Sequence, residues 1–512
     1  MDNDLLNKEV LCILDTRQIQ RFMFRSNTYI DTLGGSDLIV HILDDAIAYA
    51  LHNIEPPLNE DEYDISADPD EDIPYFKSNK ILFQLIICTA GNALFIARSG
   101  ELCRKIIRKV SRYYLENAYS LNISAAVTEK TDNFGNDIFR LYQKLNAVKA
   151  SSNISDPLGT LAVVIKEHNT GEPAIGITED SCDAYSLSSL IRRKEALCRD
   201  LIVDMKDISA TTASNGKDYV AVIHADGNNL GITIGRLLQK TSDYKLGIKR
   251  RQKINKTIEK NFARITADTM RQLEKYYYEH SKGKADFAHS FSIIHRAGDD
   301  INCICDASLA LPFTEFLYGN LEDSVLWDSD DMKVPLYACT GIAFVPSDTS
   351  FHAAFSLADE CCKSAKASAK LERNLIDGFA GNRMDFQISE NHFIGSLDRL
   401  RERFYMTREQ IDLTMRPYCL DKIAEGQPYS YKKLIERVQR LNNAHLDSKT
   451  KQIIRQSFAM GRVEFRRWIE EYLRQGIDLT KLLGEPLYTD EEKQIHSLWT
   501  DAAEISDFVL ME

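Results

Sequence analysis

Along residues 1–390, hydrophobic residues occur either in short continuous runs or at every third or fourth position. The same order of such segments, called a cycle below, occurs twice. Short apolar runs are typical of buried strands, whereas apolar residues at every third or fourth position are typical of helices. The first cycle predicts strands at residues 8–15, 81–89, 93–97, 121–127 and 161–165, with helices at 18–24, 34–51, 101–116 and 134–148. A helix at 186–206 and a polar linker at 209–217 follow. The second cycle predicts strands at 218–224, 287–296, 300–306, 334–345 and 384–388, with helices at 232–240, 252–281, 308–318 and 351–373.

The two cycles predict an internal duplication. In each cycle an apolar strand ends in an acid, Asp15 or Asp226, which precedes a hairpin alanine by 75 or 71 residues. Residues 87–93 align with residues 294–300, although only the second hairpin keeps its acids. A strand–helix–strand–strand–helix–strand order is that of a ferredoxin-like domain. We therefore predict an α+β fold with a first domain at 1–180, a helical linker at 181–217 and a second domain at 218–390.

The C-terminal region lacks the alternation typical of strands. Apolar residues recur at helical spacing near residues 396–404, 408–414, 430–442, 447–474 and 489–509. This pattern predicts an all-α C-terminal domain over residues 391–512. Its basic residues are interleaved with acids, which leaves open both a salt-bridged solvent face and a face that binds RNA or protein.

Net charge, apolar run length and cysteine spacing restrict the kinds of protein to which the chain could belong. The net charge of −13 argues against general electrostatic binding to nucleic acid, although a basic run at 245–256 could attract triphosphates or RNA locally. Residues 55–74 carry nine acids and four prolines and predict a solvated loop. The acidic start is unlike a signal peptide, and no apolar run approaches the roughly 20 residues of a membrane span. Eleven cysteines without C-x-x-C spacing indicate a reduced protein, so we expect a cytoplasmic location and no membrane contact.

An acidic turn at residues 297–300 lies between two apolar runs and predicts a tight hairpin. Two carboxylates about 4 Å apart repel by roughly 4 kcal/mol at an effective dielectric near 20, so in a cleft they need a cation. We expect the first strand of the ferredoxin-like sheet to lie beside the strand that begins the hairpin, which brings Asp226 to Asp299 and Asp300. Oxygen ligands without histidine favour Mg²⁺ or Mn²⁺. A bare solvated turn is the alternative.

The residues after Asp226 add features that suit a phosphate ligand. Gly227 lets its carbonyl approach a metal closely, and Gly231 opens a predicted helix whose amides could receive phosphate oxygens. A site of this kind can hold two ions, one at a ribose hydroxyl and one at the triphosphate.

Three motifs in order carry a resemblance to a known family. Residues 358–366 (ADECCKSAK) look like the A-D-x-A-L-Y-x-A-K helix of GGDEF-type nucleotidyl cyclases. Residues 297–300 (AGDD) resemble the G-G-D-D hairpin of the palm polymerase/cyclase subunit of type III CRISPR effector complexes. Residues 225–231 (ADGNNLG) look like its first metal motif, D-G-D-x-x-G, and residues 18–24 and 34–36 look like its first palm. The resemblance covers roughly residues 8–390.

The resemblance implies two GGDEF/palm-type domains, the first one degenerate. It implies an enzyme that joins ATP, or another nucleoside triphosphate, into a cyclic (oligo)nucleotide in anti-phage defence. It assigns metal binding to Asp226, Gly227, Asp299 and Asp300, and catalysis to these three aspartates. It assigns nucleotide binding to Asn228, Asn229, Gly231, Gly298 and Lys366, and a second, acceptor side to Gly34, Gly35 and Ser36.

The chain departs from the family pattern at several positions. Asn228 stands where many relatives have a second aspartate, and Ala297 replaces the first hairpin glycine, which requires a negative φ there. No histidine–aspartate pair of an HD-type nuclease domain and no zinc-binding cysteines between the palms are found. We therefore expect a stand-alone or minimal relative.

A second hypothesis is a catalytically weak palm pair that senses nucleotide or RNA and acts as a scaffold or adaptor in a CRISPR-like complex. Nucleoside triphosphates are the expected partners under the first hypothesis, and RNA or CRISPR-like protein subunits under the second. The sequence leaves open whether a homodimer completes the site.

Overall fold

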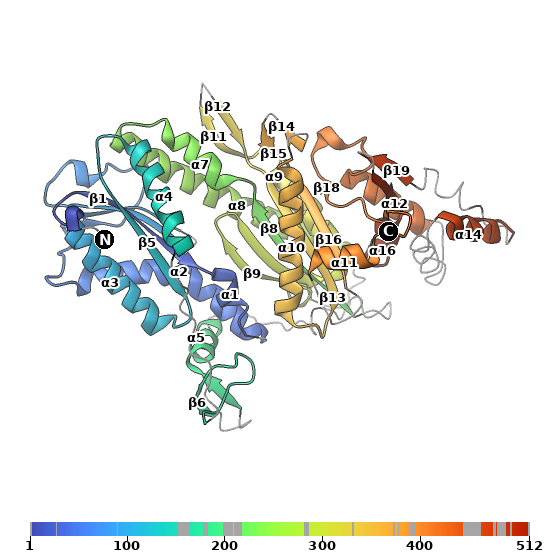
Figure 1. Cartoon of the computed structure of the whole chain (residues 1–512), viewed down its shortest axis with the longest axis horizontal. Coiled ribbons are helices and arrows are strands. Elements are labelled where there is room, and N and C mark those ends of the chain that lie inside the picture. Colours follow the sequence, from blue (N-terminus) through green and yellow to red (C-terminus); the bar gives the residue numbers. More distant parts are fainter. Residues whose placement is uncertain are drawn as a thin grey trace.

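The structure is a computed structural model of the chain, and it describes residues 3–26, 28–89, 91–151, 163–177, 183–197, 208, 218–280, 286–329, 332–371, 374–376, 378–389, 396–443, 462–474, 478, 488–491 and 494–509. Two β-sheets with their helices lie side by side, and a smaller C-terminal segment lies at the far end of the second sheet (Figure 1). The predicted α+β class is confirmed. None of the described helices has the length and hydropathy needed to cross a membrane.

The first sheet has the strand order β2-β3-β4-β1-β5. Its elements are β1 (Val10–Arg17), α1 (Ile19–Met23), α2 (Tyr29–Asn53), β2 (Tyr63–Asp64), β3 (Phe83–Thr89), β4 (Asn92–Ala97), α3 (Gly100–Asn117), β5 (Asn122–Glu129) and α4 (Phe134–Ser151). Strand β1 pairs antiparallel with both β4 and β5, which is the order of a ferredoxin-like sheet. The strand predicted at 161–165 is wrong for residues 163–165, which lie in a turn, and residues 161–162 fall outside the described residues.

The second sheet has the order β18-β16-β13-β8-β10-β9 and repeats this arrangement. Its elements are β8 (Tyr219–Gly227), α7 (Leu230–Gln239), α8 (Tyr244–His280), β9 (Phe291–Ala297), β10 (Asp300–Asp306), α9 (Ala310–Leu321), β13 (Ala338–Pro346), α10 (Phe351–Ala369) and β16 (Arg383–Ile388). Two short hairpins, β11 (Val325–Ser329) with β12 (Met332–Pro335) and β14 (Leu375–Ile376) with β15 (Phe379–Ala380), project from it. The predicted strand at 334–345 is therefore interrupted at residues 336–337.

The prediction that the first strand of the second sheet lies beside the strand that begins the hairpin is wrong. Strand β8 pairs with β10, which ends the hairpin, and β9, which begins it, lies at the sheet edge. Pairing also shifts the alignment of the two hairpins by one residue. Asn92 lies opposite Asp15, whereas Ile301 lies opposite Ala225, so Asn92 corresponds to Asp300 rather than to Asp299.

The two halves pack against each other through reciprocal contacts. Helix α2 packs on β9, and helix α8 packs on β3, so each half covers the hairpin of the other. At the first contact the Tyr29 hydroxyl of α2 donates a hydrogen bond to Ser292 of β9 at 3.0 Å, and at the second Thr89 donates a hydrogen bond to Glu259 at 2.8 Å. The apolar core is continuous across the halves, because Val220 and Val222 of β8 belong to the same buried cluster as residues of α2.

A close approach of helix to sheet holds α10 over the strands of the second half. A Cβ atom at Gly341 of β13 would lie 2.0 Å from the carbonyl oxygen of Ala358 and 2.2 Å from the amide of Cys362. Glycine is therefore needed for α10 to lie at this distance from β13. This contact brings the polar residues of α10 to the end of β8.

The linker and the C-terminal region differ in part from the prediction. A helix α5 (Leu187–Ala196) follows the strand pair β6 (Ala174–Ile177) and β7 (Ala184–Ser186), and residues 209–217 lie outside the described residues. Beyond residue 396 the described residues form the helices α11 (Leu397–Phe404), α12 (Tyr431–Asn443), α14 (Arg462–Arg474) and α16 (Thr500–Ile505). Four short strands occur among them: β17 (Ile411–Asp412), β18 (Tyr418–Cys419), β19 (Tyr488–Glu491) and β20 (Gln494–Ser497).

The all-α prediction for the C-terminal region is therefore wrong. Strand β18 extends the second sheet, and β17, β20 and β19 form a small sheet of their own. The helices predicted at 408–414 and over the first part of 489–509 are strands or turns instead. Strands this short carry too few residues for alternation to reveal them, and pairing with distant partners decides their conformation.

Candidate functional site

The end of strand β8 brings Asp226 against helix α10. The Lys366 ammonium contacts the Asp226 carboxylate oxygen Oδ2, and both side chains are partly buried. Burial alone would lower the pKa of Lys366, but the Asp226 carboxylate outweighs it and raises that pKa. The lysine predicted from the α10 motif and the first predicted carboxylate therefore form one ion pair.

Asp299 lies at the hairpin turn and faces the same strand end. A Cβ atom at Gly227 would lie 2.6 Å from the Asp299 Oδ2 atom, so only glycine leaves room for this carboxyl. Loss of water around Asp299 and the nearby Asp226 carboxylate raise the pKa of Asp299 to about 7. The turn itself uses Gly298 at φ 60°, whereas Ala297 does not take a positive φ. The structure thus tolerates the alanine that replaces the first hairpin glycine.

Asp300 points toward a buried histidine on the neighbouring strand. Its Oδ1 atom lies 3.4 Å from Nε2 of His224 and accepts a hydrogen bond from Asn302 at 2.7 Å. The other ring nitrogen of His224 lies 3.4 Å from Asp359 of α10, and its ring stacks on Phe355. His224 is therefore held between two carboxylates.

The charges of His224, Asp300 and Asp359 stabilise one another. Burial disfavours the charged imidazole, but Asp300 and Asp359 outweigh it and raise the pKa of His224 to about 10. Burial likewise pushes the pKa of Asp300 upward, but His224 outweighs it and lowers that pKa. The imidazolium is thus a fixed positive charge under the hairpin.

The oxygen atoms at the end of β8 include ligands of the kind that a divalent cation prefers. Asp226 and Asp299 bring carboxylate oxygens together, and Mg²⁺ or Mn²⁺ prefers such ligands. When no cation neutralises two adjacent carboxylates, their repulsion raises the pKa of one of them. However, no group of three or more potential ligand side chains is gathered as a metal site among the described residues. Two carboxylates and the backbone at Gly227 fit one ion, while Asp300 is engaged by His224.

The predicted nucleotide-binding residues that follow β8 lie in different surroundings. Asn228 is buried, and its amide donates to the carbonyl of Gly381 at 2.6 Å and contacts the sulfur of Cys339 at 3.1 Å. Asn229 precedes helix α7 in the left-handed region, with φ 55°, and Gly231 lies in the first turn with open space beside it. Asn228 and Asn229 also line a cavity of about 200 Å³ together with Arg236 of α7 and Lys370. The prediction that a helix opens near Gly231 is confirmed.

The glycine–glycine–serine segment of the first half lies inside helix α2, which begins at Tyr29, so the prediction that this segment opens the helix is wrong. A Cβ atom at Gly34 would lie 1.7 Å from the carbonyl oxygen of Arg192, and one at Gly35 would lie 3.7 Å from the Arg192 side chain. The Ser36 hydroxyl donates to the carbonyl of Ile294 at 2.7 Å and bonds Nδ1 of His295 at 2.9 Å. The segment therefore joins the halves beside the acidic hairpin.

Replacing Ser36 by alanine is expected to destabilise the protein by about 1 kcal/mol, because a buried carbonyl and a buried ring nitrogen lose a shared partner. Urea unfolding of the full chain measures this difference. Ser151→Ala at the exposed end of α4 is the matched control. An unchanged free energy of unfolding in Ser36→Ala would contradict the inter-half contact.

The first half contains a counterpart of the Asp226–Lys366 pair. Asp15 lies near the end of β1 as Asp226 lies near the end of β8, and its Oδ2 atom lies 2.8 Å from the Lys149 ammonium. Lys149 lies fifteen residues after Phe134, the start of α4, and Lys366 lies fifteen residues after Phe351, the start of α10. The duplication therefore includes the ion pair, and the first half differs in having Asn92 where the second has Asp300.

Sequence reasoning did not identify His224, Asn302 or Asp359. His224 lies two residues before Asp226 on the same strand, which places both side chains on one face of the sheet. That spacing was the available signal, but it could not show that α10 covers this face.

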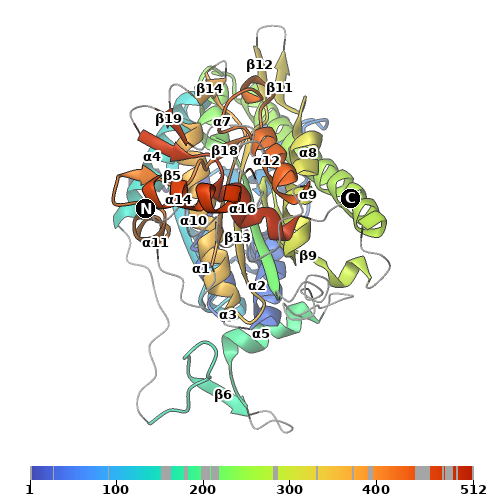
Figure 2. The ribbon, with the colours of Figure 1, turned by 90° about the vertical axis from the view of Figure 1, so that its right-hand side faces the viewer.

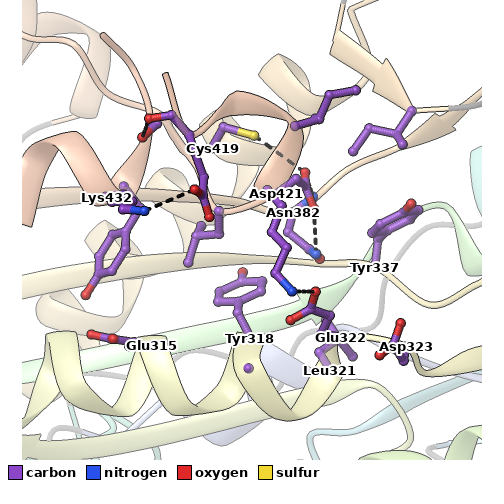
Figure 3. Close-up of a pocket in the computed structure, with 18 of the residues that line it drawn as sticks. Glu315, Tyr318, Leu321, Glu322, Asp323, Tyr337, Asn382, Cys419, Asp421 and Lys432 are labelled. Atoms are coloured by element: carbon purple, nitrogen blue, oxygen red, sulfur yellow. Dashed lines mark hydrogen bonds and ion pairs between the residues drawn. The ribbon is translucent and has the colours of Figure 1, made fainter. Parts of the chain in front are cut away.

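A larger cavity lies elsewhere. It measures about 790 Å³ and opens between α9 and the C-terminal segment (Figure 3). Acidic residues line it, with Asp421 hydrogen-bonded to Asn382 and Glu322 paired with Lys422. None of the predicted site residues lines it.

Comparisons with known proteins agree with the architecture. No family model matches the chain, and no curated protein matches it. A solved structure of an apo Csm1–Csm4 cassette is similar over 100% of this chain and 71% of that chain, with 10% identity and a TM-score of 0.50. A Csm1–Csm4 cassette in complex with cA4 matches over 99% and 70%, with 13% identity and a TM-score of 0.49. The chain therefore has a Csm1-like fold.

Proposed function

We propose that this chain is a metal-dependent nucleotidyltransferase that converts ATP, or another nucleoside triphosphate, into a cyclic (oligo)nucleotide second messenger in anti-phage defence. One observation carries the proposal: the Asp226 and Asp299 carboxylates meet at one strand end, and Lys366 contacts the first of them. The Csm1-like fold and the three sequence motifs support it.

Asp226, Asp299 and the backbone at Gly227 would hold Mg²⁺ or Mn²⁺. When bound, the metal lowers the pKa of an attacking ribose hydroxyl and offsets phosphate charge. With a cation held there, Asp226 would no longer need the Lys366 ammonium as its counter-charge, and Lys366 could bind a phosphate oxygen. The first amides of α7, beside Asn229 and Gly231, would stabilise a phosphate.

His224 is proposed as a positioning residue. It fixes the orientation of Asp300 from below the hairpin and supplies a buried positive charge next to the carboxylates. Asp359 and Phe355 hold the imidazole in place. Through these contacts α10 couples the position of the hairpin to that of Lys366.

The direct test incubates the full chain with each nucleoside triphosphate and Mg²⁺ or Mn²⁺ and resolves the products by mass spectrometry. We expect a cyclic nucleotide from at least one substrate and turnover at least about 100-fold lower in Asp299→Ala/Asp300→Ala. The matched control is Asp398→Ala on the exposed surface of α11. Full activity in the double variant, or no product from any triphosphate, would refute the proposal.

A nucleotide-sensing palm protein is the second candidate. It is favoured by Asn228, an amide in place of a carboxylate whose nitrogen binds the carbonyl of Gly381, and by the ion pair that already occupies Asp226. In that case calorimetry should detect nucleotide binding that is unaffected by chelation of divalent cations, without product. Binding that requires Mn²⁺ would favour the enzyme.

A further inference from the structure

Helix α8 carries a row of positive charges on its outer face. Lys249, Lys253, Lys256 and Lys260 follow one another at helical spacing of three or four residues, which places them on one face. They extend over roughly 16 Å, given a rise of about 1.5 Å per residue. In a chain with a net charge of −13, this row is a local reversal of sign.

The row borders a cavity that also contains a tryptophan. The cavity measures about 570 Å³ and is lined by Lys249, Arg250, Lys253, Lys256 and Lys260, with Asp70 as its acid. Trp327 of β11 forms part of its wall, with the Arg250 guanidinium 5.3 Å and the Lys253 ammonium 5.5 Å from the ring centroid. The hairpin β11–β12 stands beside α8 and thus supplies an aromatic surface next to the charges (Figure 2).

Structural ion pairs do not account for the row. Among the residues that the structure describes, Lys249, Lys253 and Lys260 have no carboxylate within ion-pair distance. Lys256 is the exception, because it lies 3.1 Å from Asp68 and 2.9 Å from Asp70. Both acids belong to the acidic loop at residues 55–74, so an anionic segment of the chain already lies against the third lysine of the row.

We infer that this groove binds single-stranded nucleic acid, with phosphates on the α8 lysines and an unpaired base against Trp327. Spaced cations next to an aromatic ring that is only partly buried, as Trp327 is, suit a single strand, because phosphates repeat along the backbone and every base has a flat face. A duplex offers no unstacked base to Trp327. The acidic loop competes for Lys256 and lowers the affinity.

The groove is separate from the carboxylate site. Ile254 and Ile258 of α8 belong to the same buried apolar cluster as Ala221 and Ile223 of β8, whereas His224 and Asp226 lie on the opposite face of that strand. The inference therefore does not rest on the proposed function. Asp299→Ala/Asp300→Ala should bind the strand as the wild type does.

Fluorescence anisotropy with labelled oligouridylates of about 12 nucleotides, one RNA and one DNA, tests the inference at several salt concentrations. Lys253→Glu/Lys260→Glu should weaken binding at least about tenfold and reduce the salt slope by roughly 1.4, the loss expected for two phosphate contacts. Arg108→Glu/Lys109→Glu on α3 changes charge equally and should leave both unchanged. Asp68→Asn/Asp70→Asn should tighten binding.

The aromatic part of the site has its own variants. Trp327→Ala should weaken binding roughly tenfold, and Trp327→Phe should retain most of the affinity, since stacking on one base is worth about that much. Equal affinity for RNA and DNA supports recognition through phosphate and base, and tighter RNA binding supports an added 2′-hydroxyl contact. Saturable binding of neither strand, binding of heparin alone, or unchanged affinity and salt slope in Lys253→Glu/Lys260→Glu would overturn the inference.

Discussion

Asp299→Asn is expected to lower nucleotide turnover at least about 100-fold while it stabilises the metal-free protein above pH 7. The two effects have one cause. The Asp299 carboxyl lies against Asp226, and burial together with that neighbour raises its pKa from 3.8 to about 7. An ionised Asp299 therefore favours cation binding, but it destabilises the folded protein when no cation is bound.

The sign of the pH dependence follows from the raised pKa. The folded protein holds the Asp299 proton more tightly than the unfolded chain, so this contribution to stability is fully present below about pH 4. It is lost as the pH rises through about 7. Asparagine never ionises, so the variant should gain at most about 4 kcal/mol relative to the wild type at pH 8.5. At pH 5.5 the gain should be smaller.

Urea unfolding at the two pH values measures this difference, with Asp61→Asn in the exposed acidic loop as the control. Adding Mn²⁺ at pH 8.5 should raise the stability of the wild type more than that of Asp299→Asn, because only the wild type keeps both carboxylates. Equal differences at both pH values would show that Asp299 ionises normally. Equal stabilisation by Mn²⁺ would place the metal elsewhere.

Asp501→Ala is expected to destabilise the protein by roughly 3–5 kcal/mol, the largest effect on stability that we predict. Asp501 is fully buried and accepts hydrogen bonds from the amide of Met415 at 2.8 Å, from Nε of Arg416 at 3.0 Å and from the hydroxyl of Tyr418 at 2.8 Å. Arg416 is buried as well and also pairs with Glu504 at 2.8 Å. Truncation removes one of the two carboxylates that neutralise a buried guanidinium and leaves its Nε without this acceptor.

The same network attaches the C-terminal segment to the second sheet. The Arg416 guanidinium donates to the carbonyl of Phe386 in β16 and lies 4.2 Å from the Phe386 ring centroid. Loss of Asp501 should therefore expose residues 396–443 to limited proteolysis before the rest of the chain. Asp501→Asn, which keeps the acceptor oxygen, should lose less stability, and Asp398→Ala on exposed α11 should lose little. A cooperative unfolding transition at the wild-type position in Asp501→Ala would contradict this account.

Much of the duplicated fold could be predicted because buried strands and amphipathic helices leave a periodic pattern. Strands β8, β10 and β13 each bury nearly every residue, and helices α3 and α10 show the helical repeat. The acidic hairpin and the Lys366 helix were recognisable as motifs for the same reason: they are local. Strands β17 and β18 were not predicted, because each has only two residues and depends on a distant partner.

The amino-acid sequence by itself determined the α+β class, the repeated element order and the identity of Asp226, Asp299, Asp300 and Lys366 as candidates. These follow from short-range patterns, which need no knowledge of neighbours. Only the tertiary structure decided that Asp300 faces His224 and that Ser36 joins the halves. It also placed the α8 lysines beside Trp327 and buried Arg416 with Asp501. Each of these contacts links residues far apart along the chain, and such contacts form only when sheets and helices pack together.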